Sequence, residues 1–250
     1  MRRDILPFAL ATLLAGLCLA PLLGRAADAI PYQVLEPLGP VGRIAGIVIF
    51  TGKAPAPRPY LINEKTELCG TERDVPAVRT QGGGLGDVVV ALKAIEAGKA
   101  HGPAPEIKRE GCEYHPRVMG MMAGQRLTLR NLDPASHVVM GEIPAERRTV
   151  FGFLQPVQGS KNRKLIEEPG LIRIYGESEP WAFSWLYVAT HPYFSVTAAD
   201  GTFALENVPP GTYTLVTWHA ALGTRSEEIE IKPSTLTQVT FTYQGTASSK

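Results

Sequence analysis

The chain has 250 residues, 44% of them hydrophobic, and its 25 Lys and Arg against 24 Asp and Glu leave a net charge of +1. This composition supports a buried core rather than a disordered chain, and the near-neutral charge gives no electrostatic case for binding nucleic acid or an acidic membrane surface. The 25 Gly and 21 Pro are high for a helical protein and indicate short strands joined by frequent turns.

The first segment has the pattern of a secretory signal. Two arginines precede an apolar run, residues 6–23, and the small residues of GRAADA follow, with expected cleavage after Ala26 or Ala29. We therefore assign residues 1–29 to a signal peptide and expect a periplasmic protein. The alternative is an uncleaved membrane anchor, because the apolar run is near the ~18-residue minimum for a span.

Removal of this segment leaves two cysteines, Cys69 and Cys112. An even pair of cysteines in an exported protein favours a disulfide between them. The alternative is that Cys112 and His115, in the sequence CEYH, contribute to a metal site. One Cys-x-x-His by itself is weak evidence for metal, so we expect the disulfide.

Three segments in the first half of the mature chain predict strands. GRIAGIVIF (42–50) alternates small and apolar residues, and DVVVALKAI (87–95) is a continuous apolar run suited to a strand buried on both faces. QRLTLRNLD (125–133) alternates cleanly and places Leu127 and Leu129 on one face of a strand.

Residues 141–169 are polar and are broken by three prolines. We predict a long loop there, with one short strand at VFGFL (150–154). LIRIY (171–175) predicts the next strand.

The run WAFSWLY (181–187) alternates aromatic side chains with others. In a strand this spacing places four aromatic rings on one face. We expect Phe183 and Trp185 to lie in the core and Trp181 to be exposed. With Trp218, the exposed Trp181 is a candidate for stacking on a sugar, which keeps a carbohydrate-binding module as an alternative function.

The C-terminal part predicts further short strands. A tight hairpin is expected at Ala-Asp-Gly (199–201), a second turn at Asn-Val-Pro-Pro-Gly (207–211), and later strands at EEIEIK (227–232) and TQVTFTY (237–243). No segment carries a long helical period. The pattern predicts an all-β chain of antiparallel β-sandwiches, and the length suggests two domains.

Two stretches resemble a known module. DGTF (200–203), followed by VPPGTY (208–213), is similar to the carboxypeptidase regulatory-like module, a transthyretin-like β-sandwich that is non-catalytic in the proteins it resembles. GRIAGIVIFTGKAP, at the start of the mature chain, resembles the first strand of the same module. The resemblance implies one such sandwich built from residues 40–100 together with 190–245.

The middle of the chain resembles a cupredoxin, the Greek-key sandwich of small copper proteins. NLDPASH matches a family strand that ends in Asn131, Asp133 and His137, and EEPGLIRIYG (167–176) resembles the strand before the copper-ligand loop. The resemblance implies a cupredoxin-like sandwich at residues 104–190, inserted into the other module. Together the two parts resemble a group of exported bacterial proteins that pair them.

The same resemblance implies where copper ligands would stand. In related proteins a Cys-x-x-His-Pro-Trp-Met loop gives the thiolate, one imidazole and the axial thioether. Here Gly176, Glu179 and Ala182 occupy those positions, and only His137 matches a ligand. Without a thiolate no blue-copper centre forms, so we expect no cofactor. The alternative is copper or zinc held by His137 and Glu179, whose imidazole and carboxylate suit either ion.

Two further histidines, His191 and His219, lie in the C-terminal part. If their strands are neighbours, they offer another metal site with His115 or Glu227. The alternative is that each forms hydrogen bonds at a strand end. No nucleophile elbow, phosphate loop or His-Glu-x-x-His motif is present, so we expect no enzyme. We predict an exported binding or accessory protein, with another periplasmic or membrane-bound protein as its partner and a role beside an electron-transfer system.

Overall fold

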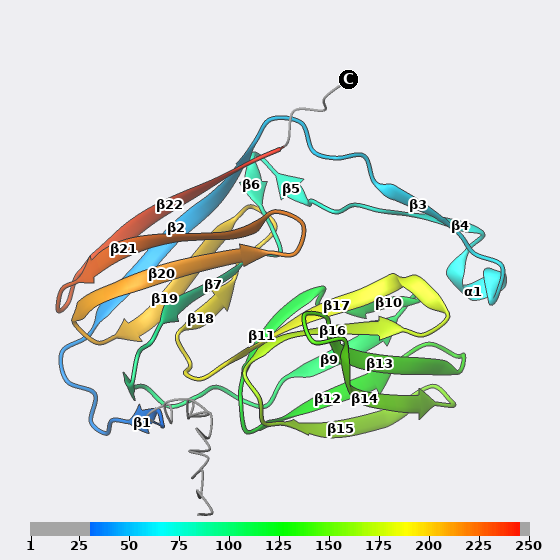
Figure 1. The fold of residues 1–250 in the computed structure, drawn as a ribbon, viewed down its shortest axis with the longest axis horizontal. Coiled ribbons are helices and arrows are strands. Elements are labelled where there is room, and N and C mark those ends of the chain that lie inside the picture. Colours follow the sequence, from blue (N-terminus) through cyan, green and yellow to red (C-terminus); the bar gives the residue numbers. More distant parts are fainter. Residues whose placement is uncertain (1–30, 246–250) are drawn as a thin grey trace, which may run out of the picture. The chain divides into compact units, whose positions relative to one another are not determined.

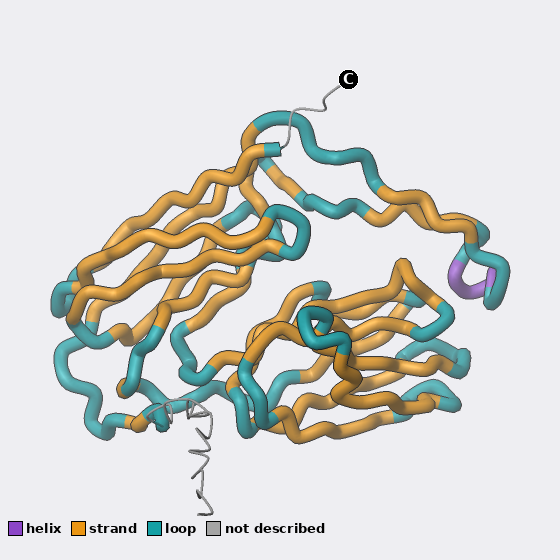
Figure 2. The backbone as a smooth tube through the Cα atoms, in the orientation of Figure 1, coloured by secondary structure: helices purple, strands orange, loops and turns teal. Residues whose placement is uncertain are grey.

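The computed structural model describes residues 31–245, so the expected signal peptide, residues 1–29, lies outside the described residues. Within 31–245 nearly all regular structure is β-strand, which confirms the predicted all-β class (Figure 2). The one helix in this range, α1 (Thr66–Cys69), has four residues. No helix in the described chain combines the length and apolar character needed to cross a membrane.

One pair of sheets combines strands from both ends of the described chain (Figure 1). Its sheets have the orders β18-β7-β20-β21 and β19-β2-β6-β5, and β22 pairs in parallel with β2. A shared hydrophobic cluster includes Ile44, Leu92, Phe203 and Leu215. The strands are β2 (Gly42–Thr51), β5 (Thr80–Gln81), β6 (Gly84–Leu85), β7 (Val89–Lys93), β18 (Phe194–Val196), β19 (Thr202–Val208), β20 (Gly211–His219), β21 (Gly223–Ile231) and β22 (Leu236–Gln244).

A second pair of sheets is formed by the middle of the chain. The orders are β10-β9-β12-β15 and β11-β17-β16-β13-β14, and their hydrophobic cluster includes Ile107, Leu127, Val139 and Ile174. Leu127 and Leu129 both point into this cluster, as the alternation of QRLTLRN predicts. The strands are β9 (Glu106–Glu110), β10 (Glu113–His115), β11 (Val118–Met122), β12 (Gln125–Asn131), β13 (His137–Ile143), β14 (Arg148–Gln155), β15 (Lys161–Ile166), β16 (Gly170–Gly176) and β17 (Glu179–Ala189).

Residues 52–79, which we call the arm, connect β2 to β5. The arm contains a two-stranded hairpin, β3 (Arg58–Leu61) with β4 (Glu72–Val75), and α1 lies between these strands. A further small sheet pairs β1 (Gln33–Val34) with β8 (Ala97–Gly98). The domain bounds predicted above stay a prediction.

The prediction of a long loop at residues 141–169 is wrong. This segment holds the end of β13 and all of β14 and β15, because its apolar side chains, among them Phe151 and Ile166, are buried in the second cluster. The short strand predicted at residues 150–154 is confirmed as part of β14. The three prolines lie in the short connections that follow these strands. Proline here marks turns between strands and not the absence of strands.

The expected hairpin at residues 199–201 is also wrong. The tight turn exists, with the Gly201 N–H donating to the Ala198 carbonyl at 2.9 Å. However, β18 before it pairs with β7, and β19 after it pairs with β2, so the turn joins two different sheets. Local turn chemistry predicts the reversal of the chain but not which strands then pair.

Candidate functional site

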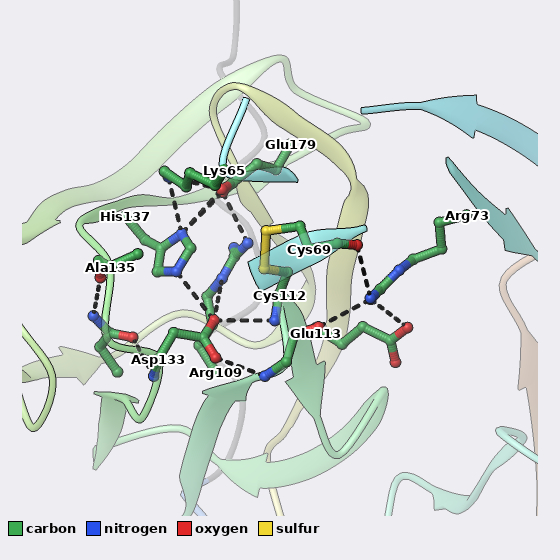
Figure 3. The surroundings of a disulfide bond; sticks show 12 residues. Lys65, Cys69, Arg73, Arg109, Cys112, Glu113, Asp133, Ala135, His137 and Glu179 are labelled. Carbon is green, nitrogen blue, oxygen red and sulfur yellow. Dashed lines mark hydrogen bonds and ion pairs between the residues drawn. A yellow bond between two sulfur atoms is a disulfide. The ribbon is translucent and has the colours of Figure 1, made fainter. Parts of the chain in front are cut away.

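A buried cluster of charged side chains gathers residues from five separate segments of the chain (Figure 3). Arg109 lies in β9, Asp133 follows β12, His137 begins β13, Glu179 begins β17, and Lys65 precedes α1 in the arm. We call these five residues the Arg109 cluster. Only Lys65 has substantial solvent exposure, at 30% of its side chain.

Arg109 is the centre of the cluster, and its side chain has 0% exposure. Its Nη2 lies 2.8 Å from Glu179 Oε2, and its Nε lies 3.7 Å from Asp133 Oδ2. The guanidinium also stands over the ring of Tyr114, 4.9 Å from its centroid. A buried cation needs such partners, because an unpaired charge in a protein interior is very costly.

The loop from Asn131 to His137 presents two members of the cluster. The Asp133 N–H donates to Asn131 Oδ1 at 3.0 Å, and Asn131 Nδ2 donates to the Ala135 carbonyl at 2.8 Å. The Asp133 carboxylate in turn accepts backbone N–H bonds from Gly111 at 2.6 Å and Cys112 at 3.0 Å. Asn131 therefore shapes the loop, and Asp133 fixes it against the turn between β9 and β10.

Both ring nitrogens of His137 are engaged within the cluster. Nε2 lies 3.0 Å from Asp133 Oδ2, and Nδ1 lies 3.0 Å from Glu179 Oε1. Lys65 Nζ approaches Nδ1 at 3.3 Å. Because each nitrogen already faces a protein partner, a metal could bind His137 only after one of these contacts is broken.

Glu179 joins the two cations and the histidine. It contacts Arg109 through Oε2, and Lys65 Nζ donates to its Oε1 at 2.9 Å. Burial alone would raise the pKa of Glu179, but the hydrogen bond from His137, the charge of Arg109 and the hydrogen bond from Lys65 outweigh burial and lower the pKa to about 2. The carboxylate is therefore ionised at neutral pH.

Gly176 leaves the space that the guanidinium uses. A Cβ at this position would lie 2.6 Å from Glu179 Oε2 and 2.8 Å from Arg109 Nη1, so no side chain fits without displacement. Gly176 pairs with Glu179 where the register of β16 and β17 shifts. The structure thus brings positions 137, 176 and 179 together around Arg109, a residue that the sequence analysis did not select.

The other candidate histidines do not join the cluster. His115 is exposed at the end of β10. His191 Nδ1 accepts the N–H of Tyr193 and His219 Nδ1 accepts the N–H of Ala221, each at 3.2 Å. Burial lowers the pKa of both, to about 4 for His219. Across residues 31–245 no group of three or more His, Cys, Asp or Glu is arranged to hold a metal ion.

The disulfide between Cys69 and Cys112 is present, which confirms the predicted pairing. It fastens α1 of the arm to the turn between β9 and β10, beside the Arg109 cluster (Figure 3). Arg73 of the arm adds an ion pair to Glu113 at 2.7 Å. A metal site with Cys112 as its thiolate ligand is therefore wrong for this disulfide-bonded form, because that sulfur is bonded to Cys69.

The expected exposure of the aromatic run is reversed. Trp181 is only 8% exposed and lies 6.4 Å from the ring of Tyr60 in the arm, whereas Phe183 and Trp185 are half-buried. The register shift at the start of β17 turns Trp181 inward. Trp218 packs edge-to-face on Trp185 at 5.3 Å. Trp181 offers no exposed face for stacking on a sugar.

Neither the sequence families nor the curated proteins searched contain a match to this chain. Among solved structures, a purple cupredoxin from Nitrosopumilus maritimus is 20% identical with a TM-score of 0.30, covering 35% of this chain and 100% of its own. A copper-containing nitrite reductase from Thermus scotoductus is 16% identical with a TM-score of 0.30, covering 39% of this chain and 25% of its own. Amicyanin from Paracoccus versutus is 13% identical with a TM-score of 0.32, and the match covers 40% of this chain and 97% of amicyanin. Similarity at these levels establishes no function for this chain.

Proposed function

We propose that this chain is an exported, non-enzymatic binding or accessory protein with a cupredoxin-like sandwich that is stabilised by an internal ion cluster and not by copper. The observation that carries the proposal is the buried guanidinium of Arg109. It lies among the positions where the sequence resemblance puts copper ligands, and it contacts both Asp133 and Glu179.

Charge balance supports this proposal. Lys65 and Arg109 supply two positive charges, and Asp133 and Glu179 supply two negative charges. Because these charges cancel, the two carboxylates offer a divalent ion no net attraction. Repulsion from each of the two cations offsets it by about 1–4 kcal/mol per unit of charge at 4 Å, for effective dielectric constants of about 80 to 20. Copper or zinc would also have to displace contacts of His137.

Metal analysis of the purified protein tests the proposal. The mature chain is incubated with Cu²⁺ or Zn²⁺, desalted, and measured by elemental analysis beside a His137→Ala variant. We expect both proteins to retain far less than one equivalent of either ion. Stoichiometric copper or zinc in the wild type that disappears in the His137→Ala variant would establish a metal carrier instead.

The partner that we propose is another periplasmic or membrane-bound protein, and its connection with electron transfer rests on the sequence resemblance alone. Chemical cross-linking in cells, followed by purification of this chain, tests this part. A specific exported partner that is enriched at stoichiometric levels supports the accessory role. An uncrosslinked chain that is found only in the cytoplasm, with residues 1–29 still attached, would overturn it.

A further inference from the structure

The outer face of the sheet β10-β9-β12-β15 carries a row of basic side chains. His115 is the register partner of Lys108, Lys108 is the partner of Arg130, and Arg130 is the partner of Lys161. Register partners on neighbouring strands point to the same face of a sheet. The four side chains therefore form one line across all four strands, which we call the basic row.

The basic row is open to solvent and belongs to a larger basic face. Lys108, His115 and Lys161 are exposed, and Arg130 is half-exposed. Among residues 31–245, only one basic residue of this face forms an ion pair: Lys161 Nζ lies 4.0 Å from Glu106 Oε1. The lysines and arginines of the face that take part in no ion pair there are Lys108, Arg126, Arg130 and Arg163, and His115 takes part in none either.

This arrangement works against folding and so calls for another explanation. Like charges directly opposite each other on neighbouring strands are destabilising, by roughly the 0.2–1 kcal/mol that opposite charges contribute. The acidic residues of the face are confined to β9 and β10, and one of them, Glu113, is already paired with Arg73 of the arm. β12 and β15 present no acidic side chain at all.

We propose that the basic row binds a linear acidic polysaccharide. Neighbouring strands lie about 4.8 Å apart, so Lys108, Arg130 and Lys161 present three positive charges at that spacing, with the imidazole of His115 at the end of the line. A polyuronate carries one carboxylate on each sugar, a repeat of similar length, and can contact several members of the row at once. Individually weak exposed ion pairs then act together through multivalency.

An anionic lipid surface and an acidic protein fit the face less well than a polysaccharide. Proteins that bind a lipid surface usually insert large apolar side chains, and protein–protein interfaces have an apolar centre. The exposed large hydrophobic residues of the described chain lie outside these four strands: Val34, Leu35, Leu61, Leu154, Val157 and Leu236. A polymer recognised by charge alone needs no such residues.

This inference deepens the proposed binding role, on which it rests, by naming a ligand class. The two proposals have separate experimental readouts. Metal analysis measures metal bound at the Arg109 cluster, and calorimetry measures polymer bound on the opposite face of β9. Retention of metal would overturn the proposed function without copper and leave the polysaccharide proposal standing. Failure to bind polymer would overturn only the polysaccharide proposal.

The test is binding of the mature chain to polygalacturonate by isothermal titration calorimetry at several salt concentrations. We expect binding that weakens as salt rises. The triple variant Lys108→Glu, Arg130→Glu, Lys161→Glu should bind about tenfold or more weakly. The control is the triple variant Lys53→Glu, Lys93→Glu, Lys232→Glu, which makes the same change in net charge on other exposed lysines. It should bind like the wild type.

Three comparison ligands decide the class: uncharged dextran, polyglutamate and vesicles with anionic headgroups. We expect no binding to dextran and weaker binding to the other two. Equal or tighter binding to polyglutamate or to vesicles, or equal losses in both triple variants, would overturn the proposal. If the triple variant unfolds, the three single reversals replace it, and each should weaken binding about twofold to fivefold. No change in any of the three would also overturn it.

Discussion

Replacement of Arg109 by methionine should cause a large loss of stability, although methionine roughly fills the same volume. The guanidinium lies 2.8 Å from Glu179 and 3.7 Å from Asp133. At an effective dielectric constant of about 20, unit charges at these separations attract by about 6 and about 4.5 kcal/mol before desolvation is subtracted. Breaking a buried pair by removing one partner typically costs about 3–5 kcal/mol, because the remaining charges stay buried.

Chemical unfolding at neutral pH measures this loss. We expect Arg109→Met to lower the free energy of unfolding by about 3–5 kcal/mol. The matched control is Arg148→Met, since Arg148 pairs with Glu146 on the surface at 2.8 Å and its side chain is 40% exposed. That change should cost about 0–1 kcal/mol. A loss below about 1 kcal/mol for Arg109→Met would refute the view that the guanidinium holds the cluster together.

The same variant tests whether Arg109 excludes metal. Without the guanidinium, Asp133, His137 and Glu179 remain close together with a deficit of positive charge. Zn²⁺ should then stabilise Arg109→Met against unfolding through binding to the folded state, and should leave the wild type unchanged. Equal effects of Zn²⁺ on the two proteins would contradict this explanation.

Three further outcomes are expected. Folding lowers the pKa of Glu179 from 4.5 to about 2, so this carboxylate stabilises the fold fully above pH 4.5. Its contribution is lost as the pH falls from about 4.5 to about 2. The loss is about 3 kcal/mol, and Glu179→Gln should abolish this part of the pH dependence in unfolding titrations. Gly176→Ala should lower the melting temperature, at a cost of about 1–3 kcal/mol, because its Cβ would lie 2.6 Å from Glu179; Gly102→Ala, with no atom within 4 Å, should leave it unchanged. The double change Cys69→Ser, Cys112→Ser opens a loop with a sequence separation of 43 and should cost up to about 4 kcal/mol, with faster hydrogen exchange in residues 58–75. Unaltered exchange there would show that the arm is held without the disulfide.

Much of the fold was readable from local pattern. The alternation of Leu127 and Leu129 gives the buried face of β12, and the even pair of cysteines gives the disulfide. The first signal lies within one short segment, and the second depends only on the number of cysteines in the chain. In segment 141–169 three prolines predict a loop, but the strands fit between the prolines, so the prediction of a loop is wrong there.

The Arg109 cluster was only partly predictable. His137, Glu179 and Gly176 were selected through a resemblance, but Arg109 sits in EIKRE, where charged residues surround a single isoleucine and indicate a surface strand. The inward direction of Arg109 follows from its alternation with Ile107, and its partners lie 24 and 70 positions further along the chain, at Asp133 and Glu179. Pairing over such separations depends on the tertiary fold and not on local propensity.

The buried guanidinium has a consequence for how this protein matures in the cell. A sandwich that is completed by copper depends on the supply of that ion, on its oxidation state and on the proteins that deliver it. The cation at the centre of the Arg109 cluster is synthesised as part of the polypeptide, and its Nη2 lies 2.8 Å from Glu179 Oε2. Under the function proposed above, the chain completes this part of its fold without a delivery step, in metal-poor and metal-rich surroundings alike.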